Sequence, residues 1–464
     1  MQNDNVKLKN LLSQKIGILG WGVENQAVAK LLLKHGAEVT ICDQNNDLER
    51  DEKISASYRL GPGYLDNLSD FEIVFRTPGL PYLNPKIQEA KGVVISSQMK
   101  LFFDLCPCQI IGVTGTKGKG TTSTLIYEIL KCQSQISNLK GQIYLGGNIG
   151  NPPIGFLDEL KKEDIVILEL SSFQLQDLDK SPHIAVILDI KIDHLDYHQD
   201  EKEYIEAKQN IVRFQSKDDF AVINADYLTS FEFGSLTPAK VLWFSRRKSV
   251  DEGTWIKNHQ LFILRTNNED IPIAKTSEVQ LRGEHNFENI AAAVVASHLA
   301  GADVSSIQKV VKTFKGLEHR LEFLGTYQDI GFYNDSYSTT PDTTIAAVKS
   351  FSEPIILLLG GSEKGANYRK LGEVISHSSV KAVLSIGRTA ARIFTEINNP
   401  KIIKISEILS IEEAVDKAIS LASRGDVILL SPASASFDRF KNYQERGRRF
   451  KEKVLNNETK ISKT

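Results

Sequence analysis

The stretch Gly112-Val-Thr-Gly115-Thr-Lys-Gly118-Lys119-Gly120-Thr121-Thr122 decides the fold class of this chain. An apolar run at 108–113 precedes it and predicts a buried strand, and the pattern at 121–132 predicts a helix. Glycines between a strand and a helix let backbone N–H groups close around phosphate, and a lysine adds positive charge. The stretch therefore predicts an ATP-binding phosphate loop, with a glycine-rich turn carrying a solvated lysine as the alternative.

This loop departs from the standard phosphate-loop pattern at two positions. Val113 stands where the first glycine is usual, and Gly120 occupies the position of the hydroxyl that follows the lysine. We therefore expect Thr121 to supply the hydroxyl for magnesium, one residue late. The residues expected to contact ATP in the loop are Gly115, Thr116, Lys117, Gly118, Lys119, Gly120, Thr121 and Thr122.

Two later segments offer metal ligands. Glu169 ends a predicted strand at 164–170, and carboxylates at the carboxyl ends of parallel strands lie where α/β sheets bind ligands. Oxygen ligands of this kind suit Mg²⁺ beside phosphates. Asp193-His194 follows the next strand, at 184–188, and His194 can join the same metal shell. A lone histidine is more often an ordinary surface or core residue, which is the alternative.

Lys208 is unusual because it lies on the apolar face of a predicted helix. Ile205 lies three residues before it, and Ile211 and Val212 lie three and four residues after it. The side chain could reach from that face to solvent. The alternative is that burial lowers its pKa and leaves a neutral amine, which can capture carbon dioxide and become a carbamate ligand for a second metal ion.

The beginning of the chain predicts a βαβ unit, with strands at 15–20 and 38–42 and a helix at 27–35. Gly20-Trp-Gly22 supplies two glycines of a dinucleotide fingerprint, but Asn25 stands in place of the third. Asp43 lies about where an acid would meet a ribose. The pattern leaves open a nucleotide-type ligand or a tight turn without one. A further rigid turn is expected at 76–81.

The last third of the chain alternates predicted strands and helices, which indicates a third parallel α/β unit. Polar clusters follow three of its strands, at 334–336, 360–364 and 431–438, and predict a binding edge. After Asn456 the lysine-rich tail lacks apolar periodicity, so we expect it to be irregular.

Length and composition exclude several other classes of protein. The 464 residues suggest about three domains, and hydrophobic (41%) and charged (25%) fractions are those of an ordered globular chain. Lys plus Arg is 56 and Asp plus Glu is 58, so the net charge of −2 argues against nucleic acid as a partner. The apolar runs are far shorter than the roughly 18 residues of a membrane span.

The first residues and the cysteines are informative through what they lack. Residues 1–8 do not have the basic start and apolar core of a secretory signal, so we expect a cytoplasmic protein. Four scattered cysteines are too few for a disulfide framework. Cys106-Pro107-Cys108 is one residue tighter than the usual zinc-ligand pair, so a metal role for it is not expected.

Taken together, these motifs resemble the Mur ligase family over nearly the whole chain, and most closely its D-glutamate-adding members. The resemblance is carried by the order and spacing of 114–119, 146–150, 168–175, Asp193-His194, Ala207-Lys208, 283–289, 316–322, 334–336, 358–361 and 431–447. It implies an ATP-dependent amide ligase of peptidoglycan synthesis that adds D-glutamate to UDP-N-acetylmuramoyl-L-alanine through an acyl phosphate. Such enzymes serve cell wall biogenesis, and with it cell shape and division.

The resemblance also implies roles for individual residues. Lys119 would neutralise the transferring phosphoryl group, while Thr121, Glu169, His194 and a carbamylated Lys208 would hold Mg²⁺, with two ions expected. Further ATP contacts would come from His285, Asn286, Arg320 and Asp335. The uridine substrate would meet Val23, Glu24, Asp43, Gln44 and Asn148. D-Glutamate would meet Thr339, Lys364, Ser436 and Tyr443.

Three departures from the family pattern affect these implications. Lys117 replaces the usual asparagine before Gly118, and Gly120 is more like the arrangement in folylpolyglutamate synthases. Tyr337 replaces a lysine that commonly follows Asp-Ser in the D-glutamate ligases. A folylpolyglutamate synthase would normally begin near its phosphate loop, whereas residues 1–105 precede the loop here.

The expected fold is α/β in three domains: a Rossmann-like uridine-nucleotide domain at 1–105, a central ATPase-like domain at 106–316, and a Rossmann-like amino-acid-binding domain at 317–464. We expect a monomer that acts on small molecules, without an integral membrane segment. Two alternatives remain, a folylpolyglutamate synthase-like ligase and a non-ligase phosphate-loop ATPase or nucleotide-binding scaffold.

Overall fold

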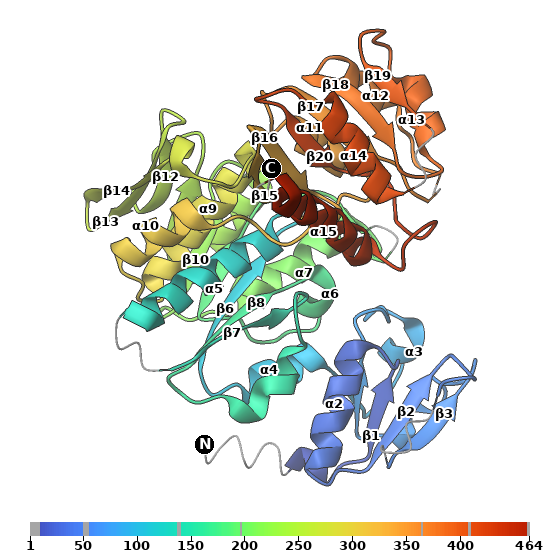
Figure 1. Ribbon diagram of the computed structural model, residues 1–464. Coiled ribbons are helices and arrows are strands. Elements are labelled where there is room, and N and C mark those ends of the chain that lie inside the picture. Colours follow the sequence, from blue (N-terminus) through green and yellow to red (C-terminus); the bar gives the residue numbers. More distant parts are fainter. Residues whose placement is uncertain are drawn as a thin grey trace. The chain divides into compact units, whose positions relative to one another are not determined.

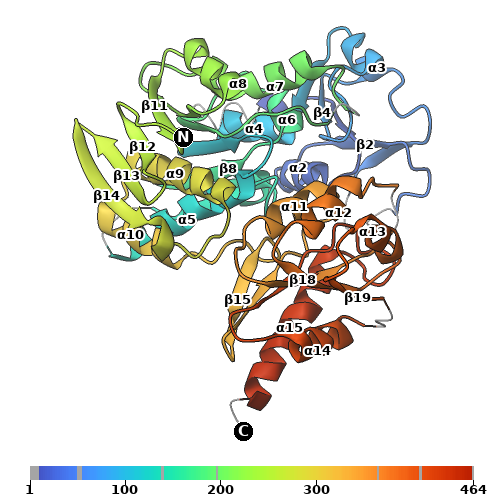
Figure 2. The same ribbon diagram turned by 90° about the horizontal axis from the view of Figure 1, so that it is seen from above.

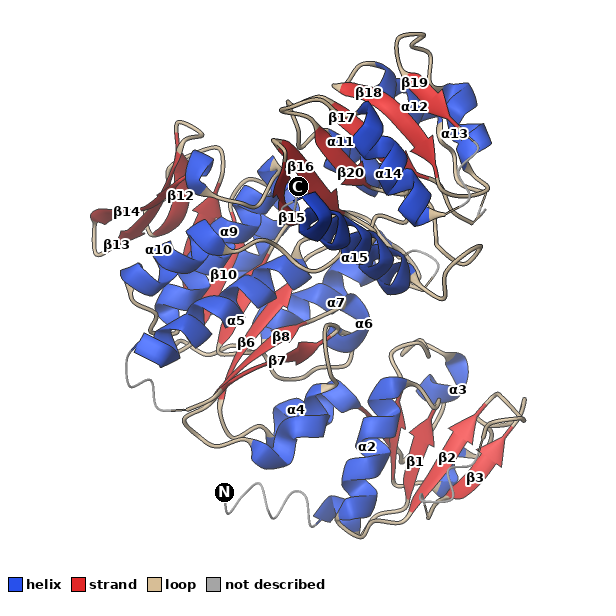
Figure 3. Ribbon diagram, viewed as in Figure 1, coloured by secondary structure: helices blue, strands red, loops and turns tan. Residues whose placement is uncertain are grey.

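The computed structural model describes residues 10–49, 55–136, 141–194, 197–362, 365–406 and 410–461. Its strands form three separate sheets in which most neighbouring strands are parallel, and helices connect them (Figures 1 and 3). The predicted α/β class is confirmed. The chain divides into two compact units, Met1–Thr276 with Glu288–Val311 and Ser277–Phe287 with Lys312–Thr464. The first unit holds two of the sheets, and the domain boundaries expected from the sequence stay a prediction.

The first sheet is parallel throughout and has the order β3-β2-β1-β4-β5. Its strands are β1 (Ile16–Leu19), β2 (Val39–Asp43), β3 (Ser57–Leu60), β4 (Ile73–Arg76) and β5 (Val94–Ser97). The helices are α2 (Val23–Lys34), η1 (Leu68–Asp70), α3 (Pro85–Gln88) and α4 (Gln98–Leu105). The strand order reverses between β1 and β4, and ligands bind at such a switch point in open α/β sheets.

Asn25 explains how the β1–α2 turn forms without the third glycine of the fingerprint. Its buried side-chain amide donates hydrogen bonds to the carbonyl oxygens of Leu19 and Gly20 at 2.9 Å and of Phe75 at 3.0 Å. The asparagine thus ties the turn to β4. A glycine at this position could form none of these bonds.

The second sheet has the order β14-β13-β12-β11-β10-β9-β6-β8-β7. Among the described strands of this sheet, only two pairings are antiparallel, β12 with β13 and β13 with β14. The strands are β6 (Gln109–Thr114), β7 (Ile143–Gly147), β8 (Ile165–Glu169), β9 (Ile184–Ile187), β10 (Phe220–Asn224), β11 (Lys240–Ser245), β12 (Gly253–Lys257), β13 (Leu261–Thr266) and β14 (Glu269–Lys275).

Helices cover both faces of this sheet. Figure 2 shows α5, α9 and α10 on one side of it and α7 and α8 on the other. The helical segments are α5 (Lys119–Ile136), η2 (Pro153–Glu159), α6 (Ser172–Leu175), α7 (Glu201–Arg213), α8 (Leu228–Phe231), η3 (Glu232–Leu236), η4 (Thr276–Glu278), α9 (Glu284–Leu299) and α10 (Val304–Thr313). No helix in the described part of the chain is long and apolar enough to cross a membrane.

The third sheet has the order β15-β16-β20-β17-β18-β19 and is parallel except for β15 with β16. Its strands are β15 (Glu322–Tyr327), β16 (Ile330–Asn334), β17 (Ile355–Leu359), β18 (Val380–Ser385), β19 (Ile403–Ile405) and β20 (Val427–Leu430). Its helices are α11 (Pro341–Val348), α12 (Arg369–Ser376), α13 (Ala390–Glu396), α14 (Ile411–Leu421) and α15 (Tyr443–Ile461).

The prediction of an irregular tail after Asn456 is wrong as far as Ile461, because α15 continues to that residue. The helix is anchored earlier, where Phe450 and Val454 are buried in the core of the third sheet. Once such a packed helix exists, each further turn adds backbone hydrogen bonds at little cost, so apolar periodicity is not needed at its end.

Candidate functional site

Four neighbouring strands of the central sheet carry four of the candidate segments. In the order β9, β6, β8 and β7, these strands are parallel, so their carboxyl ends meet at one edge. β6 leads into the phosphate loop and β8 ends on Glu169. Asn148 directly follows β7, and His194 follows β9. The fold therefore brings together residues that lie up to 80 positions apart in the sequence.

The predicted phosphate loop runs from the end of β6 to the first residue of α5. Gly118 has a left-handed φ of 86°, and a Cβ there would lie 2.2 Å from Oδ1 of Asn289, so only glycine fits. The Lys119 ammonium group donates hydrogen bonds to the carbonyl oxygens of Gly115 and Thr116, both at 3.1 Å. The Lys119 side chain thus folds back onto the loop that is predicted to bind the phosphates of ATP.

The other loop residues differ in exposure. Lys117 is exposed, Thr116 and Thr121 are half-buried, and Gly120 is buried. Thr122 is fully buried, and its hydroxyl donates to Oδ1 of Asn289 at 3.4 Å. Its hydroxyl is therefore engaged with α9, and Thr121 is the better candidate for the metal-facing hydroxyl.

Glu169 is a buried residue, and only one of its two carboxylate oxygens has a hydrogen-bond partner. Its Oε1 accepts a hydrogen bond from the side-chain amide of Asn148 at 3.0 Å. Oε2 is buried and has no hydrogen-bond partner in the structure. Gly147 keeps the two segments close, because a Cβ there would lie 2.2 Å from the Glu169 carbonyl oxygen. Buried polar atoms are normally paired, so an unpaired carboxylate oxygen beside a phosphate loop fits a metal ligand.

His194 is exposed and has a positive φ of 55°. Its ring packs edge-on against Phe173, with 5.0 Å between the ring centroids. Phe173 follows shortly after Glu169, in α6. This aromatic contact therefore places His194 against the short helix that follows Glu169.

Lys208 is buried, with a relative accessible surface of 2%, so its side chain does not reach solvent. Its ammonium group donates to the carbonyl oxygen of Gly115 at 3.1 Å and to the Thr114 hydroxyl at 3.3 Å, and it lies 4.9 Å from the centre of the Tyr204 ring. No carboxylate of the described residues forms an ion pair with it. Burial, and then the positive charge of Lys119, holds the pKa of Lys208 well below its ordinary value.

The residues predicted to meet the uridine substrate lie at the carboxyl ends of β1 and β2. Val23 is exposed at the start of α2, and Gln44 is exposed just after β2. The Asp43 carboxylate accepts the backbone N–H of Trp21 at 2.7 Å. Glu24 accepts from the Gln174 amide at 2.6 Å, and burial raises the pKa of this carboxyl group to about 7.

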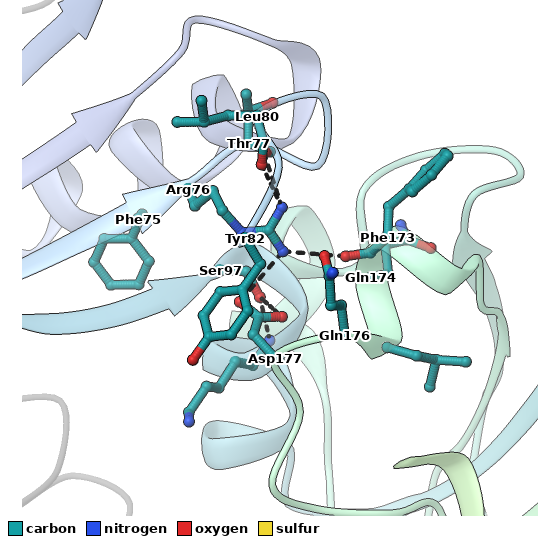
Figure 4. A network of polar contacts seen from close by, with 12 residues as sticks. Phe75, Arg76, Thr77, Leu80, Tyr82, Ser97, Phe173, Gln174, Gln176 and Asp177 are labelled. Carbon is teal, nitrogen blue, oxygen red and sulfur yellow. Dashed lines mark hydrogen bonds and ion pairs between the residues drawn. The ribbon is translucent and has the colours of Figure 1, made fainter. Parts of the chain in front are cut away.

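Arg76 was not identified from the sequence. It anchors the first sheet to the segment that follows Glu169 in the chain (Figure 4). The guanidinium group is fully buried and donates to the carbonyl oxygens of Leu80 at 2.8 Å and Phe173 at 3.1 Å. It also lies 3.5 Å from the buried carboxylate of Asp177 and 3.1 Å from the Tyr197 hydroxyl. The sequence offered one signal for this residue: an arginine at the end of an apolar run, at the start of the turn at 76–81.

His198 is a second residue that sequence analysis missed. It is buried, with Nε2 2.9 Å from the Ser172 hydroxyl and Nδ1 3.1 Å from Glu203. It therefore ties α6 to the start of α7, the helix that carries Lys208. Nothing in the sequence separates it from an ordinary surface histidine.

In the third sheet, the three polar clusters follow β16, β20 and β17, which are consecutive parallel strands. The buried Asp335 carboxylate accepts from the Ser431 hydroxyl at 2.7 Å and from the backbone N–H of Leu321 at 3.1 Å. Burial raises the pKa of Asp335 to about 7, although hydrogen bonds from Ser338 and Ser431 oppose the rise. Two of the polar clusters are thus joined by this carboxyl group.

The residues predicted to hold D-glutamate are placed as follows. Ser436 is buried, and Thr339 and Tyr443 are half-buried. Lys364 lies outside the described residues. Tyr337, which departs from the family pattern, stacks under the Arg320 guanidinium group at 3.8 Å and meets Tyr443 edge-on at 5.0 Å. The tyrosine therefore orients two other candidate residues.

Arg446, in α15, was also missed. It is buried and donates to the hydroxyl and carbonyl oxygens of Ser336 at 3.0 and 2.8 Å and to the Ser434 carbonyl oxygen at 3.1 Å. It thus holds the loops after β16 and β20 together.

Among the ATP candidates at the start of α9, His285 is exposed, whereas Asn286 is buried and donates to the Arg282 carbonyl oxygen at 2.7 Å.

Comparisons with known proteins agree with this arrangement. Residues 113–297 match the Mur ligase middle domain, and residues 319–434 match the Mur ligase glutamate ligase domain. The chain is 41% identical to a UDP-N-acetylmuramoylalanine--D-glutamate ligase of Acetivibrio thermocellus, over 96% of this chain and 97% of that protein. It is 38% identical to the protein of the same name from Clostridium tetani, over 97% and 98% of the two chains.

Solved structures show the same fold at lower sequence identity. The UDP-N-acetylmuramate-alanine ligase MurC from Thermotoga maritima has a TM-score of 0.58 at 20% identity and covers 96% of this chain and 100% of its own. The MurF ligase from Thermotoga maritima, in complex with ADP, has a TM-score of 0.58 at 17% identity and covers 95% of each chain. The chain belongs to the Mur ligase family.

Proposed function

We propose that this chain is an ATP-dependent ligase that adds D-glutamate to UDP-N-acetylmuramoyl-L-alanine in peptidoglycan synthesis. Relatives at 41% and 38% identity over nearly the whole chain carry the name of that activity. The structural observation that carries the proposal is the phosphate loop beside Glu169, whose Oε2 is buried without a partner. A phosphate loop next to an unpaired carboxylate suits the transfer of a phosphoryl group from ATP.

The chemistry requires two successive displacements. A carboxylate oxygen of the alanine residue attacks the γ-phosphorus of ATP, the bond to the bridging oxygen breaks, and ADP leaves. The amine of D-glutamate then attacks the carbonyl carbon of the acyl phosphate, loses a proton and expels phosphate. Lys119 and the backbone N–H groups of the loop stabilise the charge that develops on the phosphoryl oxygens. Lys119 already lies at the loop, through its bonds to Gly115 and Thr116.

The residues around the loop suit magnesium, which would screen the phosphate charges when it is bound. We assign Thr121, Glu169, His194 and Lys208 as its ligands. Lys208 fits this role only as a carbamate, because an ammonium group would repel the ion. Its burial without a carboxylate partner supports a neutral amine that can react with carbon dioxide. Two ions are proposed on the family resemblance.

The substrate assignments rest on the resemblance together with positions at strand ends. Val23, Glu24, Asp43 and Gln44 are assigned to the uridine nucleotide, and Asn148 to the muramoyl-peptide end. Asn148 reaches Glu169 directly, so this assignment would put the peptide carboxylate near the metal ligands. Thr339, Lys364, Ser436 and Tyr443 are assigned to D-glutamate, and His285, Asn286, Arg320 and Asp335 to ATP.

Phosphate release measured against a panel of acceptors tests the function. We expect ATP to be consumed at a useful rate only when UDP-N-acetylmuramoyl-L-alanine and D-glutamate are both present, with L-glutamate as the matched control. Turnover with a pteroyl substrate and L-glutamate would favour the folylpolyglutamate synthase alternative. Steady ATP hydrolysis that no acceptor changes would favour a non-ligase ATPase. A monomeric state and a cytoplasmic location stay predictions.

A further inference from the structure

Cys106 and Cys108 form a close pair of thiols that the ligase function does not use. They flank Pro107 in the short connection between α4 and β6. Their sulfur atoms lie 3.6 Å apart, and both side chains are partly exposed. In the described part of the chain, no other two cysteine sulfurs are in hydrogen-bond contact.

The backbone is restricted on both sides of Pro107. Cys106 caps α4, and its N–H donates to the Phe102 carbonyl oxygen at 2.8 Å. Its φ of −65° and ψ of 121° are the extended values expected before proline, and Pro107 restricts the next φ. Cys108 then leads directly into the buried strand β6. The backbone around the pair is therefore restricted, and in this conformation the two sulfur atoms lie within van der Waals contact.

The two thiols are also joined by a hydrogen bond. A hydrogen bond from Cys108 lowers the pKa of Cys106, and the same bond, followed by burial, raises the pKa of Cys108. The nearby Asp164 carboxylate opposes thiolate formation at both. Cys106 is therefore the more readily ionised thiol, and the thiolate is the nucleophile in thiol chemistry.

We propose that Cys106 and Cys108 form a thiol–disulfide exchange site whose co-reactants are small disulfides such as oxidised glutathione. The Cys106 thiolate attacks one sulfur of glutathione disulfide, and a glutathione thiolate leaves. The Cys108 thiol loses its proton and attacks the Cys106 sulfur of the mixed disulfide, and the second glutathione leaves. The protein is oxidised by two electrons, and one glutathione disulfide is reduced to two glutathione molecules.

The disulfide would be reversible rather than structural. It closes a loop of only three residues, so it constrains the unfolded chain very little. Short, strained and exposed disulfides are the more easily reduced ones. The other two cysteines provide contrast: Cys42 is buried, with its pKa raised to about 11 by burial, and Cys132 is partly exposed without a neighbouring sulfur. The exchange chemistry is thus specific to one pair, and it does not depend on the proposed function.

The test uses the full-length reduced protein, oxidised glutathione in excess, acid quenching, alkylation and peptide mass spectrometry. We expect the peptide that contains Cys106 and Cys108 to lose two hydrogens and to escape alkylation, while Cys132 remains alkylated. Dithiothreitol should restore both thiols. The Cys106→Ser variant cannot form the disulfide, so its Cys108 should carry a glutathione adduct or stay a free thiol. The control Cys132→Ser should form the disulfide as the wild type does.

Three results would overturn the proposal. One is alkylation of both thiols after equilibration with excess oxidised glutathione. Another is a stable mixed disulfide on either cysteine of the wild-type pair. The third is oxidation of Cys132 to the same extent, which would show non-specific reactivity. Circular dichroism of each variant separates a failure to fold from a failure to react.

Discussion

At the scale of single residues, Lys119 is the most exacting test of the phosphate loop. We predict that Lys119→Ala lowers kcat by several orders of magnitude, because it removes positive charge aimed at the transferring phosphoryl group. The side chain is only half-buried and its bonds go to two loop carbonyl oxygens, so the fold should persist. Steady-state kinetics with thermal unfolding measures both effects. Wild-type turnover in a folded variant would remove the lysine from the reaction.

Lys208 makes a different prediction, because its proposed role requires a change of charge. Lys208→Ala should be nearly inactive, and acetate should partly restore activity by filling the vacated space with a carboxylate. Lys208→Arg should be inactive without rescue, since guanidinium stays positive. Incubation with ¹³C-labelled carbon dioxide should give a carbamate carbon NMR signal in the wild-type protein.

The labelled signal is independent of activity, and Lys202, an exposed lysine of the same helix, supplies the matched control. Lys202→Ala should keep both the carbamate signal and the wild-type rate. Full activity after rigorous removal of carbon dioxide, or no carbamate signal at any pH, would contradict the proposal.

The sequence singled out these two lysines for different reasons. Lys119 lies in a local motif, so strand, loop and helix can be read from adjacent residues. Lys208 was visible because apolar neighbours at helical spacing surround it, and its burial bears out that pattern. In the sequence, Asn25 is only a departure from the dinucleotide fingerprint and Tyr337 only a departure from the family pattern. Their partners, Phe75 and Arg320, are distant in sequence or on another loop, so no local pattern could find them.

At the scale of elements, strand ends were the reliable signal. In a parallel sheet the carboxyl ends of all strands lie on one edge, so polar residues that follow adjacent buried strands lie near one another there. That order, β9-β6-β8-β7, could not be read from the sequence. The strands β12, β13 and β14 were missed. β12 and β14 mix polar with apolar residues, whereas β13 begins with the apolar run 261–264, which was not recognised as a strand.

Arg76 allows the anchoring of β4 to α6 to be tested. We predict that Arg76→Met lowers the free energy of unfolding by about 3–5 kcal/mol, because it leaves the Asp177 carboxylate buried without its partner. Denaturant unfolding measures the loss. The double variant Arg76→Met with Asp177→Leu should recover part of it, since no unpaired charge then remains buried.

The matched control is Lys86→Met, which breaks an exposed pair with Asp66 in the same sheet region. It should change the free energy of unfolding by less than about 1 kcal/mol. An Arg76→Met variant as stable as this control would mean that the Arg76 network does not stabilise the first sheet.

At the scale of the whole molecule, the sequence indicated three α/β units and the structure contains three sheets in two compact units. The reason that two sheets share a unit is partly the Arg76 network, together with the Gln174–Glu24 hydrogen bond. Each contact joins residues about 100 or more positions apart, and such pairing depends on side-chain geometry. Composition and periodicity carry no information about it.

Two carboxyl groups, the half-buried Glu24 in the first unit and the buried Asp335 in the second, predict how global stability depends on pH. Burial raises the pKa of each group to about 7 in the folded chain, from ordinary values of 4.5 and 3.8. Between these values the folded state binds a proton that the unfolded state has lost, so the free energy of unfolding falls as pH rises toward 7. Below the ordinary values this contribution is fully present, and above about 7 it is lost.

For each of Glu24→Gln and Asp335→Asn, we compare the free energy of unfolding with that of the wild type at pH 5.5 and at pH 8. The variant should be more stable relative to wild type at pH 8 than at pH 5.5, by on the order of a few kcal/mol. Denaturant unfolding at the two pH values measures this difference. Because the chain divides into two compact units, we expect each variant to shift the transition of its own unit. Glu49→Gln, at an exposed carboxyl group, is the control and should show no such difference. If Asp335→Asn keeps the same stability difference from wild type at both pH values, the Asp335 carboxyl group does not hold its proton in the folded chain.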